Sequence, residues 1–132
     1  MKFLSKCIFF VFLIFSISAQ AETEIPAFTS NIIDSANILT ANDVQQIHQT
    51  IQNLHDKADI WPAVYIVDHL QDEKIEQLAE RAFKKWQLGQ AKKDNGLLLV
   101  IAMKDRKSRF EVGYGLEGDL TDSTTMRVLD ET

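Results

Sequence analysis

The sequence predicts an α/β fold in which helices cover a mixed β-sheet. Helical and strand-like hydrophobic periods alternate along the chain in the order helix, strand, helix, strand, strand, helix. The most apolar segment beyond the N-terminal region, residues 97–102, is typical of a central strand. Internal repeats and low-complexity tracts are absent from the sequence.

The first half of the domain shows clear local signals. A helix is expected to begin after Thr40, because Asp43 follows three residues later in the pattern of a capping box. Residues 63–67 are β-branched and aromatic and predict a buried strand. Helical spacing of apolar residues returns over 72–86, and Gly89 marks the expected end of that second helix.

The second half predicts a hairpin followed by a closing helix. Residues 97–102 and 109–114 flank a polar turn, and the second run alternates apolar and polar residues, as in an antiparallel strand. Thr121 is the expected N-cap of the last helix. Residues 32–39 predict only a turn or a short edge piece. We expect core positions for Trp61, Phe83 and Trp86, and a basic hairpin turn formed by Lys104, Arg106, Lys107 and Arg109.

Residues 1–21 have the composition of a secretory signal peptide. Lys2 and Lys6 precede an apolar run that ends in the small residues Ala19 and Ala21. The run is shorter than the roughly 20 apolar residues that span a membrane, so an uncleaved anchor is the less favoured alternative. Cleavage after Ala21 leaves an extended arm at 22–31 and one domain at 32–132. The mature protein is therefore expected outside the cytoplasm, in the periplasm or an equivalent compartment.

The net charge and the cysteine content argue against some classes of function and of stabilisation. Without residues 1–21, 12 basic residues face 19 acidic ones, a formal net charge of −7. This balance disfavours nucleic acid as a partner. Cys7, the single cysteine, leaves with the signal, so the exported domain has no disulfide.

Residues 113–122 combine three glycines with three carboxylates and support two interpretations. Gly113-x-Gly115-x-x-Gly118 matches the dinucleotide-binding pattern. That interpretation fails, because a Rossmann unit needs a further strand and an acidic residue about 20 positions on, and only 14 residues follow Gly118. The neighbouring carboxylates would also repel a pyrophosphate.

The second interpretation is a site for a hard cation. Glu117, Asp119 and Asp122 offer the oxygen ligands that Ca²⁺ and Mg²⁺ prefer, and glycines let the loop fold around an ion. Asp94, with Asn95, could join them, because the turn before one strand of a hairpin and the loop after its partner can share one end of the sheet. The spacing is not that of an EF-hand. The alternative is that these carboxylates only favour the following helix dipole and the solvent.

The three histidines give weaker evidence for a functional site. His48 and His55 lie seven residues apart on the first helix, but no cysteine or carboxylate completes a zinc set, so surface positions are expected. His69 at a strand end could act as a base. No nucleophile motif accompanies it, since the sequence has no G-x-S-x-G.

Several short segments together point to one family: Ile33-Asp-Ser-Ala-Asn-Ile-Leu39, Trp86-Gln-Leu-Gly89, Asp94-Asn-Gly96, Asp105-Arg106, Gly113-Tyr-Gly-Leu-Glu117 and Leu120-Thr-Asp122. With these segments the chain resembles, over roughly residues 28–132, the TPM domain family, named for a thylakoid lumen protein, a photosystem II repair protein and a nematode receptor modulator.

This resemblance implies a three-layer α/β/α sandwich outside the cytoplasm, often with a C-terminal membrane anchor, and divalent-cation binding. It implies a metal set of Asp94, Glu117 and Asp122, near Asp119, and it matches Asp34 to an early family position. Acid phosphatase activity is attributed to some members. In such an enzyme Asp94 or Asp122 would hold the metal, and Arg106 or Arg109 would have to reach the substrate.

The sequence departs from the family at its C-terminal end. Family members usually continue past the position of Leu129 with a Pro-containing connection and another helix, so we expect about 25 residues of core cover to be missing here. Either the sequence is a fragment, or a partner covers the exposed sheet face, in which case a homodimer follows.

The expected function is a non-catalytic module that binds Ca²⁺ or Mg²⁺ through the acidic loop and assists the maintenance of envelope or membrane proteins. A metal-assisted acid phosphatase and a purely structural interaction domain are the alternatives. A membrane or envelope protein is the expected partner in the first case.

Overall fold

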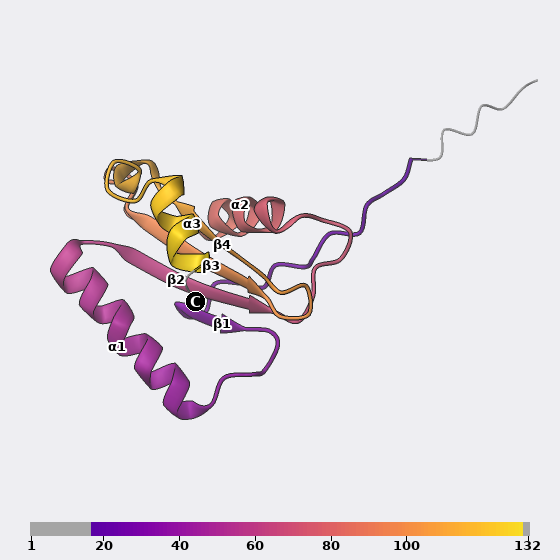
Figure 1. Ribbon diagram of the computed structural model, residues 1–132, viewed down its shortest axis with the longest axis horizontal. Coiled ribbons are helices and arrows are strands. Elements are labelled where there is room, and N and C mark those ends of the chain that lie inside the picture. The colour runs from indigo at the N-terminus through magenta and orange to yellow at the C-terminus, as the bar shows by residue number, and fades with distance from the viewer. Residues whose placement is uncertain (1–16, 131–132) are drawn as a thin grey trace, which may run out of the picture.

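Four strands form one mixed sheet in the order β1-β2-β3-β4 in a computed structural model that describes residues 17–130 (Figure 1). The strands are β1 (Ile32–Asp34), β2 (Trp61–Val67), β3 (Gly96–Ala102) and β4 (Lys107–Val112), and β4 alone runs antiparallel to its neighbour. The helices are α1 (Ala41–Ala58), α2 (Ile75–Trp86) and α3 (Asp122–Asp130), with a 3₁₀ turn, η1, at Tyr114–Leu116. The α/β class with a mixed sheet is confirmed.

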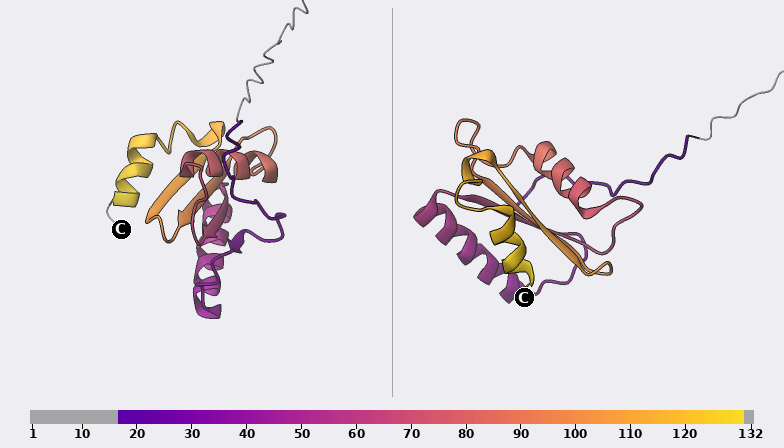
Figure 2. Two further views of the ribbon diagram at one scale, coloured as in Figure 1. Left: turned by 90° about the vertical axis from the view of Figure 1, so that its right-hand side faces the viewer. Right: turned by 45° about the horizontal axis from the view of Figure 1, so that its top comes forward.

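Helices α1 and α2 lie on opposite faces of the sheet (Figure 2). The main core lies between the sheet and α2, where Leu98 and Val100 of β3 and Leu78 of α2 are fully buried. Alternate residues of β3, such as Leu97 and Leu99, point to the other face and are only half-buried. Helix α3 lies alongside β4 at the edge of the sheet (Figure 2).

The first helix begins as the sequence predicts. The backbone N–H of Asp43 donates to Thr40 Oγ1 at 3.2 Å, and the backbone N–H of Thr40 donates to the Asp43 carboxylate at 2.8 Å. These two bonds complete the capping box. The helix ends at Ala58, and Asp59 takes a left-handed conformation with φ of 53°.

The second helix starts later than the expected range and ends where the helical spacing ends. It starts at Ile75 rather than residue 72: the Asp72 carboxylate accepts from the N–H of Ala21, and the Glu73 carboxylate accepts from the N–H of Thr23 in the arm. It ends at Trp86, where Gln87 takes the left-handed conformation before Gly89. The helix therefore ends at the last residue of the helical spacing, and Gly89 follows the end of the helix.

Residues 22–31 form an arm without regular structure until the start of the first strand, and the arm is anchored along its length. Ile25 is buried in the main core. The side chains of Tyr65, Lys85 and Trp86 donate hydrogen bonds to arm carbonyls. The arm is therefore packed as part of the folded domain.

Two expectations about side chains are wrong. Trp61 is 38% exposed and forms a T-shaped ring contact with His55 instead of entering the core, because β2 begins at the rim of the sheet. Lys107 and Arg109 do not lie in the hairpin turn, because β4 starts two residues earlier than predicted, at Lys107, and takes both residues into the strand. Trp86 is buried and Phe83 is partly buried against the core, as expected.

The expected signal lies largely outside the described residues, which begin at Ile17. Ser18 to Ala21 are exposed and irregular. Between residues 17 and 130, none of the helices combines the length and the apolar character needed to cross a membrane.

Candidate functional site

Two loops meet at one end of the sheet, called the loop end here: residues 93–95 before β3 and residues 113–119 after β4. The antiparallel register pairs Leu97 with Val112, which brings the start of β3 beside the end of β4. The N–H of Gly113 donates to the carbonyl of Gly96, and that of Gly115 donates to the carbonyl of Asp94, both at 2.9 Å. The expectation that the two loops share one end is therefore confirmed.

Glycine is required at both of these contacts. A Cβ on Gly113 would lie 2.2 Å from the carbonyl oxygen of Asp94, and one on Gly115 would lie 1.8 Å from that of Lys93. Any side chain at either position would therefore push the loops apart. Gly118 differs, since a Cβ there would meet nothing within 4 Å.

Asn95 has a structural role that the sequence does not reveal. The residue is 4% exposed. Its side-chain oxygen accepts from the N–H of Gln90 at 2.8 Å, and its side-chain nitrogen donates to the carbonyl of Asp59 at 2.6 Å. These bonds fix the loop before β3 and use both polar atoms of the amide, so we leave Asn95 out of any ligand set.

The acidic side chains of the loop end are exposed. Asp94 takes a left-handed conformation with φ of 45° in the turn before β3. Glu117 follows η1, and Asp119 lies two residues later. Asp122 begins α3, but its side chain lies outside the described residues. Among the described side chains, no group of three or more His, Cys, Asp or Glu is placed to hold a metal ion.

Asp34 lies far from these carboxylates. It ends β1 and pairs with Ile66 near the carboxyl end of β2, whereas the loop end lies at the amino ends of β2 and β3. One oxygen of Asp34 accepts from the N–H of Leu39 at 2.8 Å, and the other is buried without a hydrogen-bond partner in the described part of the chain. The structure therefore does not bring Asp34 together with Asp94, Glu117 and Asp119.

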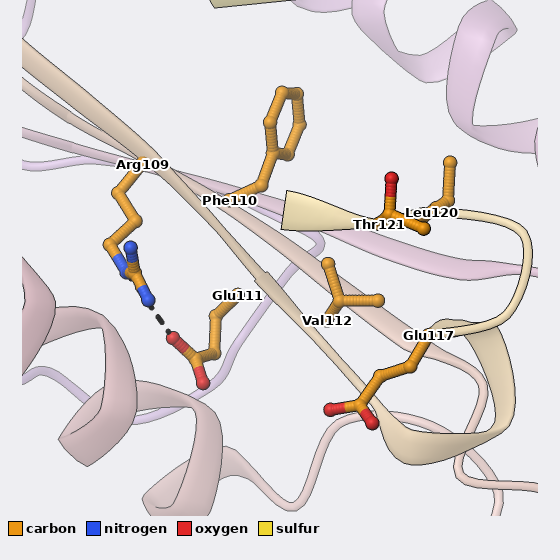
Figure 3. Close-up of a pocket in the computed structure, with 7 residues that line it drawn as sticks. All are labelled: Arg109, Phe110, Glu111, Val112, Glu117, Leu120 and Thr121. Carbon is orange, nitrogen blue, oxygen red and sulfur yellow. Dashed lines mark ion pairs between the residues drawn. The ribbon is translucent and has the colours of Figure 1, made fainter. Parts of the chain in front are cut away.

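A cavity of about 450 Å³ adjoins the loop end on the outer side of β4 (Figure 3). Its lining residues come from β4 and the segment after it: Arg109, Phe110, Glu111, Val112, Glu117, Leu120 and Thr121. Arg109 and Glu111 project from the same side of the strand and form an ion pair, with 3.6 Å between Nε and a carboxylate oxygen (Figure 3). This cavity thus holds both a guanidinium and carboxylates.

The opposite end of the sheet carries its own charged groups. Lys104 donates to Asp68 at 2.7 Å, and this hydrogen bond lowers the pKa of Asp68 while the same pair raises the pKa of Lys104. His69 contacts Asp68 and Gln71. The carboxylate of Asp105 accepts from the N–H of Leu70 at 2.7 Å, so this residue of the Asp-Arg segment ties the hairpin turn to the loop after β2.

Comparison with known proteins relates the chain to a family model and to solved structures. The family model described as TPM domain matches residues 32–132. The solution structure of the N-terminal domain of a protein from P. gingivalis matches with a TM-score of 0.71 and 29% identity, covering 76% of this chain. The match spans 64% of that chain. A search of curated proteins found no match.

Proposed function

Because this chain belongs to the TPM domain family, we propose that it is an exported, non-catalytic module that binds Ca²⁺ or Mg²⁺ at the loop end of its sheet. The observation that carries the proposal is the hydrogen bond from Gly115 to Asp94, which holds together the two loops that carry Asp94 and Glu117. Carboxylate oxygens are the donors that both cations prefer. The ligands in this proposal are Asp94, Glu117, Asp119 and Asp122.

Carboxylate oxygens are suitable ligands for these cations. The described side chains, however, do not already form a group of three or more ligands around one point. All of the described carboxylates in the proposed set are exposed, so they can turn toward an ion without breaking the core. Asp34 is left out of the set, since it lies at the other end of the sheet.

The wider role in this proposal is the maintenance of envelope or membrane proteins. Export is supported by the composition of residues 1–21 and by the exposed chain around Ala21. The net charge of −7 after removal of that segment disfavours nucleic acid as a partner.

Titration calorimetry on the chain from residue 22 tests the cation site. We expect heat of binding with Ca²⁺ or Mg²⁺, and weaker binding in Asp94→Ala and Glu117→Ala. Asp56→Ala serves as the control, because Asp56 is an exposed carboxylate at the end of α1, where it pairs with His55. Absence of heat with both cations, or equal binding by all three variants, would contradict the proposal.

Thermal unfolding separates a cation-binding module from a purely structural interaction domain. A ligand that binds only the folded state raises stability, by about 2.7 kcal/mol when its free concentration is 100 times the dissociation constant. We expect the melting temperature to rise with added cation and to return with a chelator. A melting temperature that changes with neither the cation nor the chelator would favour the purely structural interaction domain.

A metal-assisted acid phosphatase is the second candidate, and one observation favours it. Arg109 lines the same cavity as Glu117, so a guanidinium is available beside the loop end to bind a phosphate. The carboxylate of Glu111 beside Arg109 works against an anion there. Hydrolysis of p-nitrophenyl phosphate that disappears in both Arg109→Ala and Asp122→Ala would support an enzyme, whereas activity that survives Asp122→Ala would indicate contamination.

A further inference from the structure

Strand β4 is an edge of the sheet with a regular row of outward backbone groups. Because the N–H of Gly113 donates to Gly96, the hydrogen-bonded pairs of the ladder fall at Arg109 and Glu111. The alternate residues Ser108 and Phe110 therefore direct their N–H and carbonyl groups away from β3. Val112 does the same, and the described chain places no strand on that side.

Two adjacent cavities follow this edge and are together called the groove here. The cavity beside Glu117 is joined along β4 by a second cavity of about 640 Å³, and Arg109 and Phe110 line both. Thr125 and Leu129 of α3 also line the second cavity, as do residues 74–76 at the start of α2. The groove thus runs between an edge strand and a helix, which is the setting in which some recognition domains add a peptide to their sheet.

The side chains along β4 alternate in chemistry as well as in direction. Arg109 and Glu111 lie opposite Val100 and Leu98, hence on the α2 face, while Phe110 and Val112 lie on the other face. Along β4 from its N-terminal end, the basic residues Lys107 and Arg109 come first and the acidic residue Glu111 comes after them.

Arg109 also has unused hydrogen-bonding capacity. Its Nε is buried and has no hydrogen-bond acceptor within the described residues, since the nearest carboxylate oxygen of Glu111 is 3.6 Å away. A carboxylate brought in by a ligand on the α2 face could satisfy the guanidinium better than Glu111 does.

We propose that this groove binds an extended segment of another protein, which pairs antiparallel with β4 as a fifth strand. The segment places an acidic residue opposite Arg109, a basic residue opposite Glu111, and apolar residues opposite Phe110 and Val112. Main-chain hydrogen bonds to Phe110 and its alternate neighbours supply affinity, and the charge order supplies register. A single strand is the favoured occupant because α3 lies alongside the edge, where a second folded domain would meet it.

The probe is a capped, fluorescent hexapeptide, Val-Lys-Phe-Glu-Val-Glu, whose successive residues face Val112 back to Lys107. Its control exchanges the lysine with the first glutamate and so keeps the composition while placing like charges opposite Glu111 and Arg109. We expect the control to bind about tenfold more weakly by fluorescence anisotropy. The variant Arg109→Glu/Glu111→Arg should reverse the preference, with circular dichroism and thermal unfolding checking its fold.

N-methylation tests the backbone pairing independently of charge. Methylation of the peptide's Phe nitrogen, which faces Phe110, should reduce affinity at least about tenfold. Methylation of the following glutamate nitrogen, which points away from β4, should have little effect. Both measurements are made in a chelator, so that binding does not depend on the proposed cation site.

Several outcomes overturn the proposal. Equal affinity of the two peptides, or equal effects of the two methyl groups, would exclude strand addition in this register. Absence of peptide binding together with a dimer in sedimentation equilibrium would assign the edge to a second copy of the chain instead.

Discussion

The backbone N–H of Gly115 donates a 2.9 Å hydrogen bond to the carbonyl of Asp94, and this bond joins the loop after β4 to the loop before β3. It can form only because residue 115 lacks a side chain, since a Cβ would lie 1.8 Å from the carbonyl oxygen of Lys93. One glycine therefore serves both the fold and the proposed cation site. Its replacement should affect both.

Gly115→Ala is expected to lower the free energy of unfolding by about 1–3 kcal/mol, the usual cost of forcing extra atoms into a packed contact. Gly118→Ala is the matched control, because a Cβ at Gly118 meets nothing within 4 Å. That control should stay within about 0.5 kcal/mol of the wild type. Urea denaturation measures both values, and a similar loss in the two variants would show that the close approach at Gly115 does not hold the loops.

The N-terminal arm should be strongly coupled to α2 through Glu73. This carboxylate is 4% exposed and accepts from Arg81 at 2.6 Å and from the backbone N–H of Thr23 at 2.7 Å. Glu73→Ala leaves the N–H of Thr23 without its acceptor and removes the nearest carboxylate from Arg81, which keeps its bond to the carbonyl of Thr23. The expected cost is about 2–3 kcal/mol, less than for a fully buried pair because Arg81 is 33% exposed. Urea denaturation measures the loss.

Glu80→Ala on the same helix is the control for the arm. Glu80 pairs with Lys84 at 2.8 Å, but both side chains are well exposed, so its loss should change stability little. Limited proteolysis should cut the arm faster in Glu73→Ala than in Glu80→Ala. Equal cutting rates would mean that Glu73 does not anchor the arm.

Local signals in the sequence predict most of the fold. Thr40 and Asp43 lie three residues apart, so their capping box depends on almost nothing else in the chain. The pairing of β3 with β4 follows in the same way from a short polar turn between two apolar runs.

Long-range contacts could not be predicted, because no local pattern encodes them. Glu73 looks like an ordinary polar residue before a helix, yet it binds Thr23, which lies 50 positions away. Trp61 looks like a core aromatic, but its place at the rim of the sheet leaves it partly exposed. For the site, Asp94 and Glu117 could be assigned to one end of the sheet from the hairpin, whereas Asp34 is placed at the other end by parallel pairing with β2.

The two faces of β3 should differ sharply in their sensitivity to truncation. Leu98 is fully buried against α2, whereas its neighbour Leu99 faces the other side and is only half-buried. Leu98→Ala is expected to cost about 2–5 kcal/mol, the range for large-to-small changes in a core. Leu99→Ala removes the same atoms from the same strand and should cost clearly less. Equal losses by urea denaturation would mean that the second face is as well covered as the first.

The capping box predicts how α1 responds to acid. Hydrogen bonds from the backbone N–H and hydroxyl of Thr40 lower the pKa of Asp43 from its ordinary value of 3.8. Because the folded pKa lies below the unfolded one, the stabilisation is present above about pH 3.8 and is lost as the pH falls through the lower folded pKa.

Asp43→Asn cannot titrate, so the stability difference between wild type and this variant should be largest near neutral pH and should shrink in acid. Thr40→Ala, which removes the hydroxyl that Asp43 accepts from, is expected to cost about 1 kcal/mol near neutral pH. It should also reduce the pH dependence of the effect of Asp43→Asn, because the remaining backbone bond from residue 40 then lowers the carboxyl pKa by itself. Urea midpoints at a series of pH values measure these differences, and a wild-type advantage over Asp43→Asn that does not change with pH would contradict the assigned role of the carboxylate.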